Sequence, residues 1–209
     1  MRKIKLLLSQ AVEFEQERGE LRDWTDQRLV RFLDTLGFFV IPVPNCLCDR
    51  DLESGDVGHR LVSWINDLQV GGIVLGGGND IGQMPCRDLT ESILLDQALI
   101  QQLPVLGICR GMQLISTKFG SQLTHAVGHV AVQHQVSGEI NRNVNSYHSR
   151  QILNCPEGFR VLARSKDGCI EAIRNDDLGW EGWMWHPERT NKWDYEDCRR
   201  TKQLFTPKH

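Results

Sequence analysis

The stretch Pro104-Val105-Leu106-Gly107-Ile108-Cys109-Arg110-Gly111-Met112-Gln113 decides how this chain folds. Its apolar beginning is typical of a buried strand, and the residues after Gly111 have the pattern of a helix. A cysteine between two glycines at such a junction predicts a sharp turn of the nucleophile-elbow kind, which lifts the thiol above the end of the sheet. The N-terminus of the following helix carries partial positive charge and favours the thiolate form of Cys109. We therefore expect Cys109 to act as a nucleophile.

The first half of the chain alternates strand-like and helix-like segments around this junction. Its apolar runs end in turn signals, and the apolar spacing between them is that of amphipathic helices. Strands separated by helices of this length pair in parallel, which predicts a doubly wound, mostly parallel sheet with helices on both faces. The predicted strands are 4–9, 38–43, 72–75 and the run before Cys109; the predicted helices are centred on 29–36, 61–68 and 95–99, the last capped by Asp88 with Glu91 in a capping-box arrangement.

The second half has a different pattern. Short strand-like runs dominate from Gln122 onward, separated by turn signals such as Pro156-Glu157-Gly158. We expect these runs to extend the sheet with a small antiparallel portion and a helix at 195–205 to close the fold. Residues 1–209 are expected to form one α/β domain. The predicted strands are 129–136, 143–148, 159–163, 169–174 and 182–186.

Composition and charge argue against several classes of function. A formal net charge of −3 on 209 residues gives no electrostatic basis for binding nucleic acid or an anionic membrane. No apolar run reaches the length of a membrane span, and the one at 4–8 is too short for a signal peptide, so we expect it to be the first strand. The seven cysteines are odd in number and lack disulfide or zinc spacing, which favours a reducing cytoplasm.

A second motif, Trp185-His186-Pro187-Glu188, supplies a base and a group to orient it. Glu188 lies on the same side as His186 if the segment is extended, and Pro187 favours extended geometry at the histidine. With Cys109 these residues predict a Cys/His/Glu triad. The attacked carbonyl also needs hydrogen-bond donors, and we expect them from the main chain after Cys109 and from the glycine turn at 76–78.

Each motif also has an ordinary alternative. The cysteine turn could surround a buried thiol, the His-Pro-Glu sequence could be a surface turn, and the glycine turn could hold a phosphate. The three occur in the right order, and two of them follow strands whose carboxyl ends meet at one edge of a parallel sheet, where ligands bind. That arrangement favours a shared catalytic site.

Other polar residues are weaker candidates. His148 could contact substrate or be structural, and several arginines could hold an anion. His125, His129 and His134 are irregularly spaced with no carboxylate beside them in sequence, so we do not expect them to bind a metal. No metal or other cofactor is expected.

The motifs Gly76-Gly77-Gly78-Asn79-Asp80, Gly107-Ile108-Cys109-Arg110-Gly111-Met112-Gln113 and Trp185-His186-Pro187-Glu188-Arg189 together resemble the class I glutamine amidotransferase family. Within that family, the residues Cys109-Arg110-Gly111-Met112-Gln113 are most similar to the γ-glutamyl hydrolase branch. The resemblance covers nearly the whole chain and implies a flavodoxin-like fold. It departs from the family pattern at Gly76, where relatives often carry serine; we expect no loss of chemistry, because the backbone acts there.

The resemblance also assigns roles to individual residues. It implies a triad of Cys109, His186 and Glu188, an oxyanion hole formed by Gly77 and Arg110, and a γ-glutamyl pocket shaped by Gln113. The residues that it suggests for substrate binding are Gly78, Asn79, Gln113, Ser146, Tyr147, His148, Arg22 and Arg189.

The expected activity is hydrolysis of a γ-glutamyl amide through a thioester, with release of glutamate. Leu21-Arg22, Val144-Asn145-Ser146 and Met184-Trp185-His186 resemble branch members that cleave γ-glutamyl-CDP-amidate during modification of capsular or surface polysaccharide. Three alternatives stay open: a γ-glutamyl-γ-aminobutyrate hydrolase, a glutaminase subunit that feeds ammonia to a partner synthase, and a non-catalytic binding protein. The expected partners are a small γ-glutamyl molecule and either a second copy of the chain or a synthase.

Overall fold

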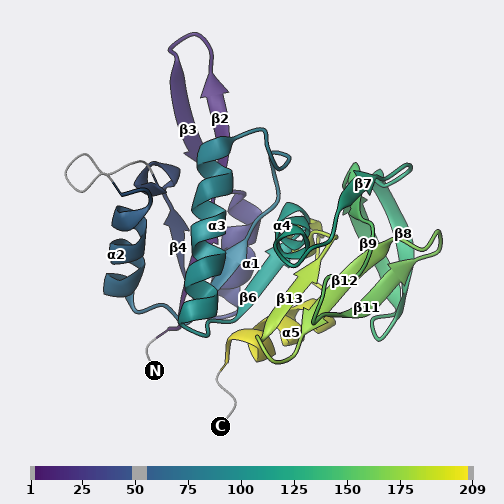
Figure 1. Ribbon diagram of the computed structural model, residues 1–209. Helices are drawn as coiled ribbons and strands as arrows, with labels where there is room; N and C mark the ends of the chain where they lie inside the picture. Colours follow the sequence, from purple (N-terminus) through teal and green to yellow (C-terminus); the bar gives the residue numbers. More distant parts are fainter. Residues whose placement is uncertain (1–2, 49–55, 207–209) are drawn as a thin grey trace.

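The strand that leads to Cys109 lies near the middle of a large mixed sheet (Figure 1). A computed structural model describes residues 3–48 and 56–206, and within these residues the sheet has nine strands. Neighbouring strands run parallel in its first part and antiparallel in its last part. In sheet order the strands are β4 (Phe39–Val43), β1 (Lys5–Ser9), β5 (Gly72–Leu75), β6 (Val105–Ile108), β13 (Trp180–Trp183), β12 (Ile170–Asn175), β11 (Arg160–Ser165), β8 (Val130–Gly138) and β9 (Arg142–Tyr147).

Helices cover both faces of the parallel part, as predicted (Figure 1). Successive side chains of a strand point to opposite faces. In β1, Leu6 and Leu8 therefore pack in one core cluster and Leu7 in another. The first cluster contains residues of α1 (Gln27–Thr35) and α5 (Tyr195–Phe205). The second contains residues of α2 (His59–Leu68), α3 (Pro85–Ile100) and α4 (Arg110–Lys118). None of the helices in the described ranges is long and apolar enough to cross a membrane.

A hairpin that the sequence analysis did not anticipate extends away from the sheet (Figure 1). Its strands are β2 (Ala11–Glu15) and β3 (Glu20–Trp24), joined by a turn with Gly19 at a φ of 65°. Every residue of β3 is exposed, and only two residues of β2 are buried. The hairpin therefore lacks the burial pattern by which a strand is recognised in sequence.

The start of α3 differs from the prediction. The helix begins at Pro85, directly after Met84, so Asp88 lies in its first turn and is not its cap. Proline suits this first position because it has no N–H to leave unpaired. Glu91 is fully buried and pairs with Arg87, so the predicted capping box is wrong.

Four further short elements complete the described chain. β7 (Leu123–His125) and β10 (Arg150–Ile152) form a separate antiparallel pair. A 3-10 turn, η1 (Asn45–Cys48), follows β4, and another, η2 (Pro187–Arg189), follows the sheet's central strands. The strand predicted at 182–186 is β13, which ends at Trp183, three residues before His186.

Candidate active site

Cys109 lies at a strained turn between β6 and α4. Its backbone has φ 53° and ψ −105°, an unfavourable conformation for a residue with a side chain. The cysteine N–H still donates to the Trp183 carbonyl at 2.6 Å, which anchors the turn to β13. Both flanking glycines are needed for close approach. A Cβ on Gly107 would lie 2.6 Å from the carbonyl carbon of Gly111, and a Cβ on Gly111 would overlap the carbonyl oxygen of Leu75.

His186 and Glu188 form a buried pair beside this cysteine. The Nδ1 atom of His186 lies 2.6 Å from Oε1 of Glu188, and both side chains are buried. Burial lowers the pKa of the imidazole, but hydrogen bonding to Cys109 and Glu188 outweighs it and raises that pKa to about 9. The imidazolium is therefore favoured at neutral pH beside the sulfur. This combination suits an activated cysteine nucleophile.

The route by which Glu188 reaches His186 is not the predicted one. His186 has the extended geometry that Pro187 favours, with φ −108° and ψ 95°. The chain then enters η2, so Glu188 approaches the ring through a tight turn and not across one face of a strand.

Asn145 on β9 holds the main chain of His186 in place. Its side-chain Oδ1 accepts from the His186 N–H, and its Nδ2 donates to the His186 carbonyl, both at 2.8 Å. The two bonds fix the backbone from which the imidazole projects. The sequence analysis quoted Asn145 within a motif but gave it no role, because the signal lies in a contact across 41 positions of the chain.

The glycine turn after β5 packs against the imidazole. A Cβ on Gly77 would lie 2.7 Å from Cε1 of His186, so only glycine fits at this position. Arg87 holds the turn from the other side, where its Nη2 donates to the carbonyls of Gly76 and Gly77 at 3.0 and 2.8 Å. Arg87 is another functional residue that the sequence analysis missed.

A buried ion network links this turn to the cysteine elbow. Glu91 pairs with Arg87 at 3.1 Å and also with Arg110, and both arginines are almost fully buried. Arg110 pairs in addition with Asp88. Burial lowers the pKa of each guanidinium to about 10. One carboxylate thus compensates two desolvated cations, and the network fixes the two proposed oxyanion positions relative to each other.

A cavity of about 190 Å³ opens over the sulfur. Eight residues expected at the site line it: Cys109, His186, Arg110, Gly78, Gln113, Tyr147, His148 and Arg189. Gln113 is held there by a hydrogen bond from its Nε2 to the Arg150 carbonyl at 3.1 Å. The guanidinium of Arg189 stacks 5.0 Å above the ring of Tyr147, and these two side chains form one wall of the cavity.

Three expected substrate-binding residues lie outside this cavity. Arg22 is on the protruding hairpin and pairs with Glu20 at 2.8 Å. Asn79 exchanges hydrogen bonds with the main chain of Val12 at 2.8 and 2.9 Å, which ties the hairpin to the glycine turn. Ser146 is fully buried and donates to a main-chain carbonyl. In this structure these side chains make structural contacts.

Comparison with known proteins identifies the family to which this chain belongs. The model described as glutamine amidotransferase class-I matches residues 27–197. A γ-glutamyl-CDP-amidate hydrolase of Campylobacter jejuni is 33% identical over 126 residues, which are 57% of this chain and 62% of that protein's length. A glutamine-hydrolysing GMP synthase subunit of Methanocaldococcus jannaschii is 29% identical over 171 residues, or 77% of this chain and 81% of that protein.

Solved structures share the fold. A Thermoplasma acidophilum protein described as a GMP synthase subunit superposes with a TM-score of 0.71 at 22% identity, covering 98% of this chain and 94% of that one. A glutamine amidotransferase from Thermotoga maritima superposes with a TM-score of 0.62 at 13% identity, covering 90% of this chain and 77% of that one. The family model spans most of the chain, and the chain belongs to the class I glutamine amidotransferase family.

Proposed function

We propose that this protein hydrolyses a γ-glutamyl amide with Cys109, His186 and Glu188 as its catalytic triad. The observation that carries the proposal is a buried imidazole–carboxylate pair whose imidazole lines the same small cavity as a cysteine on a strained strand-to-helix turn. Membership of a family of cysteine-dependent amide hydrolases supports it. The small cavity over the sulfur suits the γ-glutamyl group.

In the proposed reaction, the sulfur of Cys109 attacks the γ-carbonyl carbon, and the carbonyl π electrons move to the oxygen. Main-chain N–H groups of Gly77 and Arg110 stabilise this oxyanion. As the C–N bond breaks, His186 gives its proton to the leaving nitrogen, and a γ-glutamyl thioester remains. His186 then takes a proton from water, the resulting hydroxide attacks the thioester carbon, and glutamate leaves as the sulfur regains its electron pair.

As substrate we propose γ-glutamyl-CDP-amidate, with cytidine diphosphoramidate as the leaving group. The Campylobacter relative is named for this activity. A second cavity of about 470 Å³ adjoins the first and shares Tyr147, His186 and Arg189 with it. Lys192 also lines this larger space. Arg142, Asp194 and Asp197 line it too, but they pair with one another. Arg189 and Lys192 are then the cationic side chains that suit an anionic diphosphate.

The test compares three substrates. Purified protein is incubated separately with γ-glutamyl-CDP-amidate, γ-glutamyl-γ-aminobutyrate and glutamine, and the glutamate released is measured. We expect the highest kcat/KM for the nucleotide. A preference for γ-glutamyl-γ-aminobutyrate would keep the hydrolase and change its substrate, whereas no glutamate from any of the three would end the hydrolase proposal.

Matched cysteine variants separate catalysis from the other roles of thiols. Cys109→Ala should abolish glutamate release, while Cys198→Ala, in the outer helix α5, should leave it unchanged. If the protein only binds its ligand, Cys109→Ala should keep the biological activity of the wild type.

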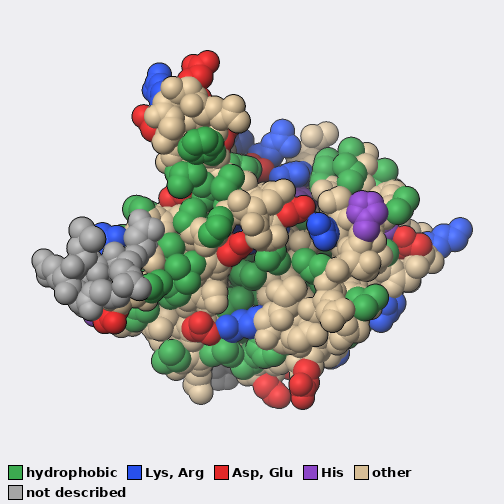
Figure 2. Space-filling model, turned by 45° about the horizontal axis from the view of Figure 1, so that its top comes forward, with side chains coloured by type: hydrophobic (Ala, Val, Ile, Leu, Met, Phe, Trp, Pro, Cys, Tyr) green, Lys and Arg blue, Asp and Glu red, His purple; other side chains and the backbone are tan. Residues whose placement is uncertain are grey.

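A second candidate is a glutaminase that passes ammonia to a synthase. The Methanocaldococcus GMP synthase subunit matches 77% of the chain, and the hairpin β2–β3 exposes apolar side chains that a partner could cover. Phe14, Leu21 and Trp24 are exposed by 51, 62 and 42%, and Figure 2 shows hydrophobic surface below the charged hairpin tip. This candidate predicts low glutaminase activity alone and a rise when a co-purified synthase is added.

A further inference from the structure

Three histidines converge on one buried carboxylate behind the wall of the catalytic cavity. His129 precedes β8, His134 lies on β8, His148 follows β9 and Glu171 lies on β12. One nitrogen of each histidine lies 3.4 to 3.5 Å from the same oxygen, Oε1 of Glu171. The sequence analysis set His129 and His134 aside because no carboxylate neighbours them in sequence, but in three dimensions Glu171 lies beside both.

The facing atoms of this cluster are not satisfied by hydrogen bonds. Glu171 is fully buried, and within residues 3–48 and 56–206 neither of its carboxylate oxygens has a hydrogen-bond partner. The same holds for Nδ1 of His129 and for Nε2 of His134 and His148. Buried polar atoms are normally paired, so unpaired nitrogens around an unpaired carboxylate indicate a group that binds between them.

In His129 and His148, the hydrogen bond of the outer nitrogen, which faces away from Glu171, determines whether the inner nitrogen, which faces Glu171, carries a proton or a lone pair. Nε2 of His129 lies 2.8 Å from an oxygen of Asp167, and Nδ1 of His148 lies 3.0 Å from the Arg150 carbonyl. Carboxylates and carbonyls only accept, so the outer nitrogens carry the protons and the inner nitrogens of neutral rings present lone pairs. Lone pairs aimed at a carboxylate repel it, but the same arrangement orients histidines around a metal ion.

The distances agree with such an ion. Zinc binds imidazole nitrogen and carboxylate oxygen at roughly 2.0 to 2.2 Å, which places neighbouring ligands of a tetrahedron about 3.3 to 3.6 Å apart. The nitrogen-to-oxygen distances from His129 and His134 to Glu171 are 3.4 and 3.5 Å. The ligand atoms of His129, His134 and Glu171 also lie within 4.8 Å of one another.

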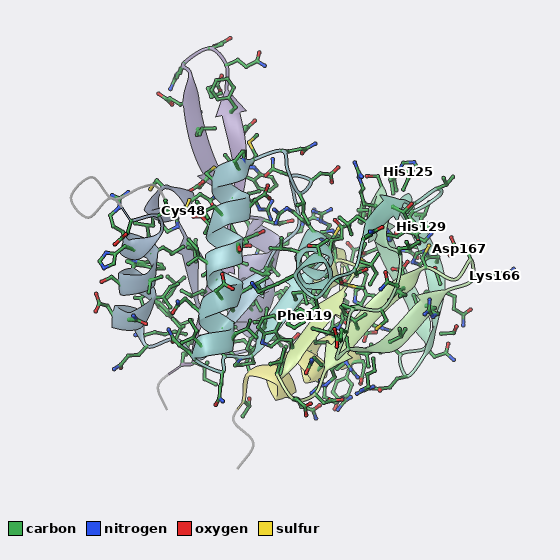
Figure 3. All side chains as sticks on the ribbon, in the orientation of Figure 1. Cys48, Phe119, His125, His129, Lys166 and Asp167 are labelled. Atoms are coloured by element: carbon green, nitrogen blue, oxygen red, sulfur yellow. The ribbon has the colours of Figure 1, made fainter. Side chains whose placement is uncertain are left out.

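An access route leads to the cluster from the surface. A cavity of about 430 Å³ is lined by His129, His134 and Asp167 among others. Figure 3 shows His129 and Asp167 close together at this end of the molecule. Cys169 lies 3.5 Å from the nitrogen of His129 that faces Asp167, so these two residues surround the outer side of the ring and do not face Glu171.

We propose that this cluster is a binding site for one divalent metal ion, and that the ion is Zn²⁺. Two neutral imidazoles and a carboxylate form a donor set that zinc binds, with a fourth position left for water or another ligand. The proposed ligands are His129, His134 and Glu171. The ion would fix the cavity wall through Glu171, because Nε2 of His148 lies 3.5 Å from Oε1 of Glu171. His148 in turn lines the cavity over Cys109 and shares the Arg150 carbonyl with Gln113.

Metal analysis of the purified full-length protein tests the site. After dialysis, plasma mass spectrometry should find about one zinc ion per chain, as a structural site of this type holds. Glu171→Gln and His134→Ala should each lose that zinc. His125→Ala removes an exposed histidine from the neighbouring strand β7 and should keep it.

Two measurements on the wild type keep the test decisive if a variant does not fold. Removal of zinc by a chelator should lower the Tm, and Co²⁺ added to the stripped protein should give the visible absorption of tetrahedral cobalt. Stripped wild type that neither binds Zn²⁺ in a calorimetric titration nor gains Tm with it would overturn the proposal. Equal zinc in wild type and both cluster variants would also overturn it, because the ion would then be bound elsewhere.

Discussion

Replacing Gly77 by alanine should damage catalysis far more than the same change at Gly76. A Cβ at Gly77 would lie 2.7 Å from Cε1 of His186, well inside the 3.4 Å at which ordinary contact begins. A Cβ at Gly76 would meet nothing closer than 3.6 Å, and neither glycine has a positive φ. The same glycine-to-alanine change can therefore be made at two adjacent positions, and only at Gly77 does the added Cβ contact the proposed catalytic base.

The expected size of the effect follows from this geometry. To restore ordinary contact, the ring of His186 or the turn must move by about 0.7 Å, the difference between the two distances. A misplacement of about 1 Å at a catalytic group costs on the order of a hundredfold in rate. We therefore expect Gly77→Ala to lower kcat about tenfold to a hundredfold. Asn145 and Glu188 restrain the ring, which prevents it from moving away freely.

The assay has a readout that does not depend on the substrate. Glutamate release gives kcat for each variant, and the rate at which iodoacetamide alkylates Cys109, followed by peptide mass spectrometry, reports on the thiolate. Both should fall in Gly77→Ala and stay near the wild type in Gly76→Ala. If the two variants keep kcat within about threefold of each other, Gly77 does not position the proposed base as this geometry implies.

Further predictions concern the network and the base. Glu91→Ala leaves the buried Arg87 without its carboxylate and leaves Arg110 with Asp88 alone, so it should cost about 3–5 kcal/mol in urea unfolding. Glu196→Ala, at a half-buried ion pair of the outer helix α5, should cost less than about 1 kcal/mol, and equal costs would contradict the network's role. Asn145→Ala leaves the buried N–H and carbonyl of His186 without hydrogen-bond partners, so it should lower the free energy of unfolding by about 1–3 kcal/mol. It should also lower kcat more than it changes KM. An effect confined to KM would argue against a positioning role. The pKa of His186 is raised from 6.5 to about 9, so its contribution to stability should be complete below pH 6.5 and lost as the pH rises through about 9. Activity should fall over the same alkaline range. Activity that rises through this range would contradict an imidazolium at His186.

The fold could be predicted because its signals are local. The apolar run before Cys109 and the glycines on either side of it need only their own neighbours to indicate a strand, a tight turn and a helix. Alternation of such units then implies parallel pairing, which β1, β4, β5 and β6 confirm. The antiparallel strands of the second half and membership of the amidotransferase family are confirmed as well. The domain limits 1–209 and the cytoplasmic location stay predictions.

The features that sequence reasoning missed depend on contacts between distant segments. Asp88 and Glu91 have the spacing of a helix cap, but both carboxylates pair with Arg110, which lies on another helix. The hairpin at 11–24 buries only Ala11 and Val12 and is held by hydrogen bonds to Asn79 and Asn45, which come much later in the chain, so its own sequence lacks the pattern of a buried strand. A carboxylate beside His129 could not be inferred either, because Glu171 comes 42 positions later and reaches it only across the sheet.

Strand β9 joins the proposed catalytic pair, His186 and Glu188, to the histidine cluster because its side chains alternate between two faces. Asn145 holds the main chain of His186, and the ring of Tyr147 meets that imidazole edge-on at 5.8 Å. Ser146, between them, points the other way and donates to the carbonyl of His129 at 2.7 Å. A shift of one residue in the pairing of β9 would exchange these two faces. A metal ion that fixes the histidine side would therefore also fix the register on which the position of His186 depends.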